Sequence, residues 1–254
     1  MREEPAGDFN YEQTGNTYSS IRQPEPRFTS LIRSAFGDAK SLLNVGAGAG
    51  SYEPDDMEVT AVEPSESMRL QRPTHLVTAI DAIAEDLPFP DDSFDASLAS
   101  ITIHQWRDLH QGLSEIRRVT IGPVVILTFE PLALGKFWLS EYAPELMKHE
   151  CGRMPNFDVI KNSLSGSFEA MAVPIPFECV DGFAEAFFGR PEAFLDEKVR
   201  NQQSAWGFIS HEAQVASIAR LQRALEDGSW DEKHGALRKQ SEYFGGLSLI
   251  VSKP

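Results

Sequence analysis

Short apolar runs alternate with helical patterns through the first half of the chain. Apolar side chains recur at i, i+3, i+4 and i+7 from Phe28 to Phe36, which predicts a helix that packs on a sheet. A second such helix, with Leu113 and Ile116 on its apolar face, is predicted before residue 120. Strands are predicted at 41–45, 59–63, 76–80, 95–100 and 124–129. Strands separated by helical segments indicate an α/β fold with a mainly parallel sheet and right-handed crossovers.

The pattern changes after residue 129. The sequence predicts an aromatic-rich helix at 135–150, another helix at 157–164 and a strand at 169–177. Helical stretches at about 181–209 (broken at 189–191) and 211–227 follow, and a last strand at 247–251. We expect a mobile polar tail over 1–16 and a single domain over 17–254. Cap elements are expected at about 131–165 and 181–240, over the ends of the strands.

The first predicted strand runs directly into closely spaced glycines. Gly46, Gly48 and Gly50 follow Ser41–Val45, a pattern typical of a turn where the backbone bends sharply and a ligand approaches without meeting a Cβ. The second strand ends in Glu63, whose carboxylate is placed to accept hydrogen bonds from both hydroxyls of an adenosine ribose. Together these features predict a crevice for a nucleoside cofactor.

The spacing of the glycines favours one kind of nucleoside cofactor. Dinucleotide sites use G-x-G-x-x-G and place the pyrophosphate on the N-terminus of the next helix, but this chain lacks the third glycine of that pattern. Pro54 and its acidic neighbours leave room for about one helical turn before the second strand. Those carboxylates would also repel a phosphate, whereas they would not disfavour binding of a ligand that carries a sulfonium cation and no phosphate. The spacing therefore favours S-adenosylmethionine over NAD.

With these motifs in order, the chain resembles the class I S-adenosylmethionine-dependent methyltransferases that act on small molecules. The resemblance runs from about Tyr18 to Phe129 and rests on the segments 44–50, 62–68, 85–95 and 95–106. It implies a Rossmann-like, seven-stranded, mainly parallel sheet with an antiparallel last strand. A helical cap would be inserted after strand five and before the last strand.

The resemblance also implies roles for single residues. Glu63 would bind the ribose, Met68 would pack on the adenine, and Arg22 would neutralise the cofactor's carboxylate. The residues implied for the cofactor are Tyr18, Arg22, Asn44, Gly46, Ala47, Gly48, Glu63, Pro64, Met68, Ala84, Glu85, Ser100 and Ile101. Where many relatives carry an acid for the adenine amino group, this chain has Ile83, and Asp81 or Glu85 is the alternative.

Methyl transfer needs positioning, exclusion of water and, for a protonated acceptor, a nearby base. His104, just past the fourth strand, is the candidate base, and its alternative role is to pack with Trp106 and bond a backbone group. Other candidate acids or bases are Glu130 and the pairs His149-Glu150 and His211-Glu212. Trp138 and Tyr142 follow the fifth strand and are the candidate substrate contacts.

Composition limits the partners. The chain has 254 residues, 41% of them hydrophobic, and a net charge of -15, which argues against nucleic acid and against an anionic membrane surface. We see no apolar run of about 20 residues and no signal-peptide pattern. Cys151 and Cys179 match no metal or redox spacing. We expect a cytoplasmic monomer or homodimer without a metal.

The sequence thus predicts an S-adenosylmethionine-dependent methyltransferase, EC 2.1.1.-, acting on oxygen, nitrogen or carbon of a small, partly apolar metabolite. The alternative is a protein that binds S-adenosylmethionine without methyl transfer, as a sensor or a cyclase-like catalyst. A nicotinamide enzyme is disfavoured by the glycine spacing.

Overall fold

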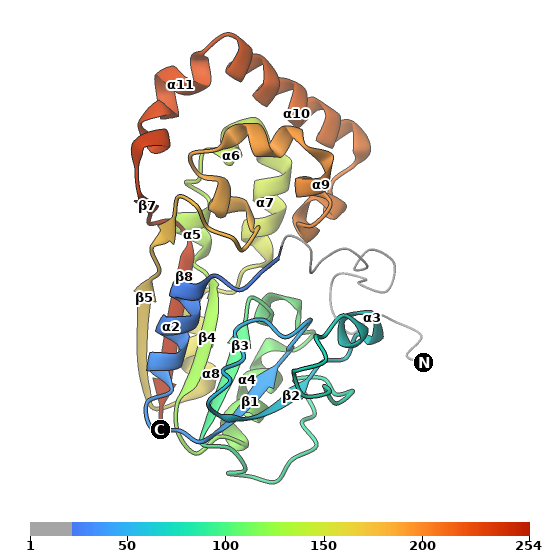
Figure 1. Ribbon diagram of the computed structural model, residues 1–254, viewed down its shortest axis with the longest axis vertical. Coiled ribbons are helices and arrows are strands. Elements are labelled where there is room, and N and C mark those ends of the chain that lie inside the picture. Colours follow the sequence, from blue (N-terminus) through green and yellow to red (C-terminus); the bar gives the residue numbers. More distant parts are fainter. Residues whose placement is uncertain (1–21) are drawn as a thin grey trace.

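The computed structural model describes residues 22–254. A twisted sheet forms the lower part of the molecule and a helical cap the upper part (Figure 1). The six strands lie in the order β2-β1-β3-β4-β8-β5. They are β1 (Ser41–Val45), β2 (Glu58–Val62), β3 (Ala96–Ser100), β4 (Val124–Phe129), β5 (Ser167–Ala172) and β8 (Leu247–Lys253).

Pairing in the sheet is mixed. The strands β2, β1, β3 and β4 are parallel, whereas β8 runs antiparallel to both of its neighbours, β4 and β5. The parallel strands β1, β3 and β4 are buried along most of their length, as expected where helices cover both faces of a sheet. This arrangement confirms the predicted α/β, Rossmann-like fold with an antiparallel strand near one edge.

The predicted strand at 76–80 is wrong. Only an isolated bridge between Ile80 and Val62 forms there, so the described sheet has six strands instead of seven. Val77 and Ile80 are both 42% exposed at this edge, so no burial favours extending the pairing. The predicted strand at 169–177 also divides: after β5, the short β6 (Ile175–Pro176) leaves the main sheet and pairs with β7 (Glu242–Tyr243).

Helices cover both faces of the sheet. On one face, α4 (Leu109–Arg118) and α8 (Phe157–Leu164) bury Leu113, Ile116 and Ile160 in a common cluster. On the other face, α2 (Pro26–Ala35) buries Phe28 and Ile32, and the short α3 (Glu66–Leu70) follows β2. Since α8 packs on the sheet, it is not part of the cap, although the cap was expected to include it.

The cap is built from short helices. It contains α5 (Pro131–Leu134), α6 (Leu139–Tyr142), α7 (Pro144–Arg153), α9 (Glu197–Arg200), α10 (His211–Glu226), α11 (Ser229–His234) and 3-10 turns at Ala184–Phe187, Pro191–Leu195, Ser204–Phe208 and Gly235–Lys239. The helix predicted over 135–150 breaks before Pro144, which begins α7. The helical stretch predicted at about 181–209, with a break at 189–191, forms mostly 3-10 turns.

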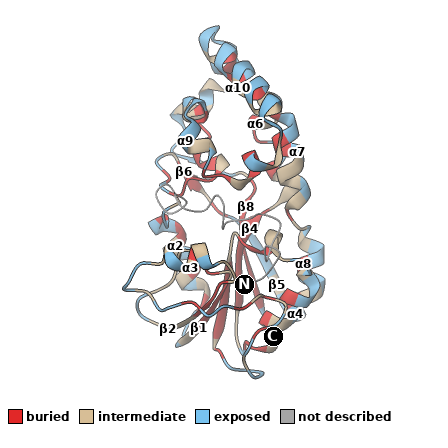
Figure 2. Ribbon diagram, turned by 90° about the vertical axis from the view of Figure 1, so that its right-hand side faces the viewer, coloured by how far each residue is buried: buried red, intermediate tan, exposed pale blue. Residues whose placement is uncertain are grey.

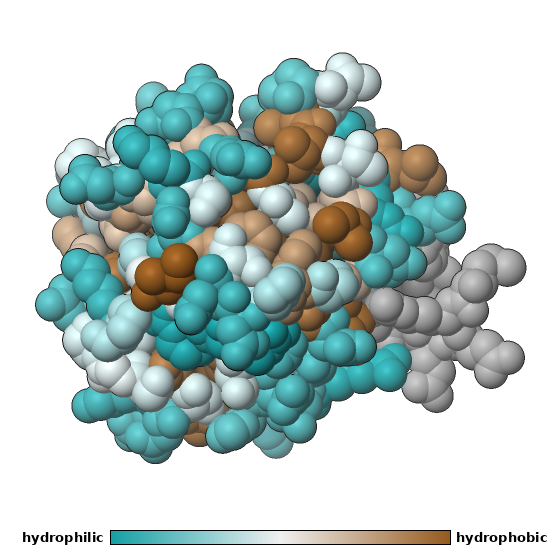
Figure 3. Space-filling model, turned by 90° about the horizontal axis from the view of Figure 1, so that it is seen from below, coloured by the Kyte–Doolittle hydropathy of each residue, from teal (hydrophilic) through white to brown (hydrophobic). Residues whose placement is uncertain are grey.

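Sheet and cap share one hydrophobic core. A single cluster of buried residues includes Leu42 and Leu98 of the strands and Trp138, Trp206 and Trp230 of the cap. Buried positions follow the strands and the inner faces of the cap helices (Figure 2). On the face seen from below, hydrophilic side chains surround smaller apolar patches (Figure 3). Within residues 22–254, no helix is long and apolar enough to cross a membrane.

Candidate active site

The glycine loop after β1 is shaped by contacts that a larger residue would not tolerate. Gly46, Gly48 and Gly50 have φ values of +68°, +51° and +98°. A Cβ on Gly46 would lie 2.2 Å from Thr102 Oγ1, and one on Gly50 would lie 2.3 Å from Leu76 Cδ1. A Cβ on Gly48 would meet only Met68 Cε, at 3.3 Å. Gly46 and Gly50 therefore let the loop pack, whereas Gly48 keeps space open beside Met68.

No α-helix follows the loop, as its short connection to β2 predicts. Residues 51–57 form turns, so no helix N-terminus faces a ligand there. The acids of this segment repel a phosphate less than the sequence suggests, because two of them are paired. Glu53 forms a buried ion pair with Arg72 at 2.8 Å, and Asp56 pairs with Arg33 at 2.8 Å. The missing helix end is then the main argument against a phosphate ligand.

Glu63 lies directly against the glycine loop. Its carboxylate oxygens accept hydrogen bonds from Gly48 N at 2.8 Å and from Ser65 N at 2.9 Å. Burial raises the pKa of Glu63, while these two N–H donors lower it. Asn44, at the end of β1, donates to Glu53 at 2.9 Å, and its Oδ1 is buried without a hydrogen-bond partner in the described part of the chain.

Two adjoining hollows contain the predicted cofactor residues. We call the first the glycine-loop crevice; among the predicted residues it is lined by Arg22, Asn44, Gly46, Ala47, Gly48, Glu63, Met68, Ser100 and Ile101. The second, the side pocket, is lined by Glu63, Pro64, Ala84 and Glu85. Both hollows share Gly46, Glu63, Thr102 and Gln105. Tyr18 lies outside the described residues. Sequence reasoning missed Tyr52, Thr102, Gln105 and Asp181 in the crevice and Trp106 in the side pocket.

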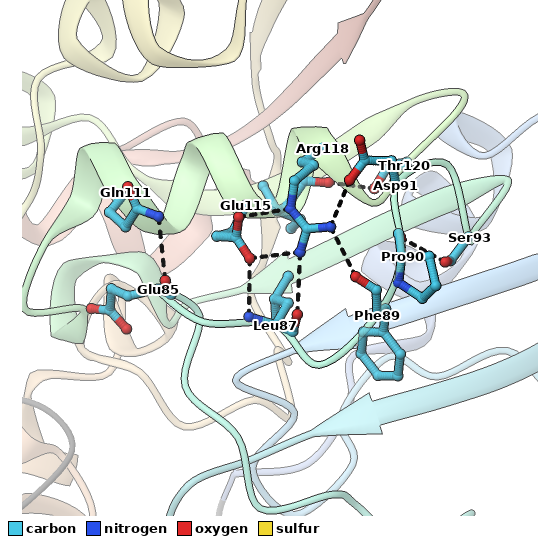
Figure 4. A network of polar contacts seen from close by, with 11 residues as sticks. Glu85, Leu87, Phe89, Pro90, Asp91, Ser93, Gln111, Glu115, Arg118 and Thr120 are labelled. Atoms are coloured by element: carbon cyan, nitrogen blue, oxygen red, sulfur yellow. Dashed lines mark hydrogen bonds and ion pairs between the residues drawn. The ribbon is translucent and has the colours of Figure 1, made fainter.

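The wall of the side pocket is fixed by polar contacts to α4. Glu85 Oε1 accepts from the backbone N–H groups of Arg107 and Asp108 at 2.7 and 3.1 Å. Beyond it, Arg118 bonds Glu115, Asp91 and the carbonyls of Leu87 and Phe89 (Figure 4). Asp81, the other candidate for the adenine amino group, pairs with Arg69 at 3.5 Å and does not line the pocket.

A third hollow, the cap cavity, begins where the glycine-loop crevice ends. The two share Arg22, Ile101 and Gln105. The space between the lining atoms of the cap cavity amounts to about 640 Å³, a volume that includes open solvent. Its further lining residues are His104, Phe129, Leu134, Leu146, Met147, Glu150, Phe183, Ala184, Glu185, Gln203, Ser204 and Ala205. It therefore lies between the carboxyl ends of β3 and β4 and the cap.

His104 lines the cap cavity from a 3-10 turn, Ile103–Gln105. Burial lowers the pKa of His104 well below its usual value, and the nearby charges of Arg153 and Arg22 lower it further. Its Nδ1 is buried without a hydrogen-bond partner among residues 22–254. The imidazole is therefore neutral at neutral pH and suited to accept a hydrogen bond, but taking a full proton beside two guanidinium groups is costly.

Glu185, which sequence reasoning missed, is the most deeply buried acid of the cap cavity. It has no exposed surface, and its carboxylate accepts from Gly246 N at 2.8 and 3.0 Å and from Leu247 N at 3.3 Å. Burial raises the pKa of Glu185 to about 7, against the lowering effect of these N–H groups. The only signal in the sequence is one acid within the apolar run 183–188.

Trp138 and Tyr142, the predicted substrate contacts, line none of these three hollows. Trp138 is buried in the cap, where it packs edge to face on Phe194 and Trp230 and its indole donates to Phe188 O at 2.8 Å. Leu146 and Met147 of α7 face the cavity instead. Of the other candidates, Glu130 caps α5, His149 stacks on Phe208, and His211 is exposed at the start of α10.

Comparison with known proteins agrees with this geometry. Residues 43–123 match the family described as a methyltransferase domain. The chain also superposes on a proposed methyltransferase from an antibiotic biosynthesis pathway of Anabaena variabilis ATCC 29413, with a TM-score of 0.85 and 28% identity, covering 92% of this chain and 99% of that one. Residues 43–123 are thus similar to the class I S-adenosylmethionine-dependent methyltransferase domain. The methyl donor of such domains is S-adenosyl-L-methionine, as predicted.

Curated relatives of this methyltransferase domain act on different acceptors. One is 2-methyl-6-phytyl-1,4-hydroquinone methyltransferase 2 of rice, 28% identical over 41% of this chain and 33% of that protein. Another is malonyl-[acyl-carrier protein] O-methyltransferase of Pseudescherichia vulneris, 27% identical over 49% of this chain and 53% of that protein. The chain spans between a third and about half of the length of these relatives.

The fold is also that of the [4+2]-cyclase SpnF, with a TM-score of 0.55 and 16% identity over 96% of this chain and 97% of that one.

Among the described residues, no three His, Cys, Asp or Glu side chains come together to hold a metal ion.

Proposed function

We propose that this protein transfers the methyl group of S-adenosylmethionine to a small, partly apolar metabolite held between the sheet and the cap. The observation that carries the proposal is the junction of the glycine-loop crevice with the cap cavity at Arg22, Ile101 and Gln105. A methyl group presented from the crevice at this junction would face a molecule in the cavity. Such a junction allows the in-line approach that methyl transfer requires.

The crevice and the side pocket fit S-adenosylmethionine in shape and charge. Glu63 would accept hydrogen bonds from the ribose hydroxyls, and the apolar Ile83, Ala84 and Trp106 would surround the adenine in the side pocket. The aminoacyl part would lie along the glycine loop, where any Cβ on Gly48 would take up space. When bound, the cofactor would supply an electrophilic methyl group to an acceptor in the cap cavity.

The cap cavity suits a small acceptor with an apolar body and a polar end. Phe129, Leu146, Met147 and Phe183 supply apolar wall, and Gln203 and Ser204 supply hydrogen-bonding groups. The hydroquinone and malonyl acceptors of the relatives differ from one another. We therefore do not infer the acceptor atom of this protein from them.

Glu185 is the group we assign to receive a proton from a hydroxyl or amine acceptor. His104 is the weaker candidate, because Arg153 and Arg22 disfavour its protonation. Glu150 is paired with Arg153 at 2.7 Å. A carboxyl whose pKa lies at about 7 is near the optimum for a base at neutral pH. His104 would then orient the acceptor as a hydrogen-bond acceptor.

The proposal is tested by measuring the formation of S-adenosylhomocysteine with a panel of acceptors. The panel contains phenols, aromatic amines, carboxylic acids and carbon nucleophiles. Ala184→Leu, which fills the cap cavity, should lower turnover about tenfold or more without changing the affinity for the cofactor. Ala193→Leu is the matched control, because Ala193 is also half-buried in a 3-10 turn of the cap but does not line the cavity. Tight cofactor binding without turnover across the whole panel would favour the non-transferring alternative, such as a cyclase.

A further inference from the structure

The charges on the wall of the cap cavity do not balance. Of the described residues that line it, those with a charged side chain are Arg22, Glu150 and Glu185. Arg22 forms an ion pair with Asp181, and Glu150 forms one with Arg153. Within residues 22–254, Glu185 forms no ion pair. When Glu185 is ionised, the wall therefore carries one negative charge without a counterpart.

The structure holds the Glu185 carboxylate in one position, between the cap and the start of β8. The backbone N–H groups of Gly246 and Leu247 donate to it at 2.8 and 3.3 Å. Gly245 leaves room for it, because a Cβ there would lie 2.1 Å from Glu185 Oε1. An ionised carboxylate has about four acceptor positions, so these two donors leave others unused. The wall thus presents an acid that is fixed in place and can still accept hydrogen bonds.

Neighbouring titratable groups do not supply the missing positive charge. Burial, followed by the charge of Glu185, raises the pKa of Tyr243 to about 12. Burial also raises the pKa of Cys151, with smaller contributions from Glu150 and Glu185. His104 is neutral as well, because burial lowers its pKa well below its usual value. In the free protein the charge of Glu185 is thus balanced by a proton of its own, up to about pH 7.

The charge of a ligand decides how well it suits this wall. A carboxylic acid would bring a second negative charge into the cavity, and an alcohol would leave the charge of Glu185 without a counterpart. An ammonium group would neutralise that charge and donate to its unused acceptor positions. The apolar side chains of Phe129, Leu146 and Phe183 would surround the rest of the ligand.

On the basis of the proposed function, we propose that the methyl acceptor is an amine with an apolar body, bound as its ammonium form with the nitrogen against Glu185. The ammonium group takes the place of the proton that Glu185 holds in the free protein. This choice narrows the acceptors considered above, because hydroxyl and carboxylic acid acceptors do not balance the charge of the wall.

The same contact prepares the nitrogen for methyl transfer. The ammonium nitrogen gives one proton to the Glu185 carboxylate, and the lone pair that this frees bonds the methyl carbon. The methyl–sulfur bond breaks, and its electron pair stays on the sulfur, which becomes neutral. The nitrogen again has four bonds and a positive charge. Apolar walls favour the proton transfer, because low polarity disfavours an ion pair relative to a neutral acid and a neutral amine.

Calorimetry at pH 8 on the protein saturated with S-adenosylhomocysteine tests the proposal. The ligands are matched amines, alcohols and carboxylic acids on phenylethyl, naphthylethyl, cyclohexylethyl and octyl skeletons. On at least one skeleton the amine should bind about tenfold or more tightly than its alcohol, and the carboxylic acid more weakly than both. Glu185→Gln should bring the amine to within about threefold of the alcohol by weakening the amine alone.

Glu130→Gln is the matched control. Glu130 is also partly buried, and its carboxylate also accepts from a backbone N–H group, that of Ala133 at 2.6 Å. It does not line the cap cavity. The preference for the amine over the alcohol should therefore be the same in Glu130→Gln as in the wild-type protein.

Alcohols that bind the wild-type protein as tightly as their amines would overturn the proposal, even if Glu185→Gln does not fold. Failure of every amine to bind the complex with S-adenosylhomocysteine would also overturn it. So would equal losses for amine and alcohol in a folded Glu185→Gln variant, because the carboxylate would then serve only the shape of the cavity. Methyl transfer to alcohols or carboxylic acids alone would overturn this proposal and leave the proposed function standing. Failure to bind S-adenosylhomocysteine would instead overturn the proposed function itself.

Discussion

Replacing Glu185 by Gln should change how stability depends on pH. The pKa of Glu185 is 4.5 as a reference and about 7 in the folded protein. Because the folded protein holds this proton more tightly, the contribution of Glu185 to stability is full below pH 4.5 and is lost as the pH rises through 7. The loss is about 1.4 kcal/mol per pH unit up to the folded pKa and levels off above it. Between pH 5 and pH 8 it therefore amounts to about 2.5 kcal/mol. Glutamine has a similar shape and does not ionise, so the variant lacks this loss.

Urea denaturation of both proteins at pH 5, 6, 7 and 8 and one ionic strength measures this effect. The free energy of unfolding of Glu185→Gln, relative to wild type, should rise by about 2.5 kcal/mol from pH 5 to pH 8. Glu63 and His104 titrate in both proteins and cancel in the difference. Glu212→Gln, on the exposed start of α10, is the control and should show almost no trend between pH 5 and pH 8, since hydrogen bonds lower the pKa of Glu212 and its titration lies below this range. A relative stability that stays constant within about 0.5 kcal/mol would refute the conclusion that burial raises the pKa of Glu185.

Three further outcomes are expected. Glu63→Ala should weaken S-adenosylhomocysteine binding about ten- to a hundredfold in calorimetry, and Gly46→Val should abolish it, because its side chain would collide with Thr102; unchanged affinity in both would place the cofactor elsewhere. Trp138→Ala should lower the free energy of unfolding by about 3–5 kcal/mol in urea without changing the acceptor KM of the folded enzyme. With a hydroxyl acceptor, His104→Ala should lower kcat less than about tenfold and Glu185→Gln about a hundredfold or more; the reverse order would restore His104 as the base.

Most of the sheet and the glycine loop were predictable because they depend on local signals. Alternation of apolar runs and glycines located β1 and β4 at their observed bounds, and the segment 44–50 identified the loop. The strand at 76–80 failed because its apolar residues lie at an exposed edge, where composition alone does not create pairing.

The acceptor side was less predictable, since its geometry depends on distant contacts. Glu185 is held by the backbone of Gly246, 61 residues away, and in the neighbouring crevice Asp181 is bonded by Tyr52, 129 residues away. Trp138 carries the same sequence signal whether it faces a cavity or a core. Only the packing of α11 against it, through Trp230, decides between the two.

The core shared by sheet and cap limits how this enzyme could acquire a new acceptor. Leu42 of the central strand and Trp230 of α11 belong to the same buried cluster. A cap transplanted from a relative would have to match that cluster residue by residue, or the sheet beneath it would lose its packing. Change of specificity, in evolution or in the laboratory, is therefore expected to proceed by single replacements at positions such as Ala184, Gln203 and Ala205, with the scaffold left whole.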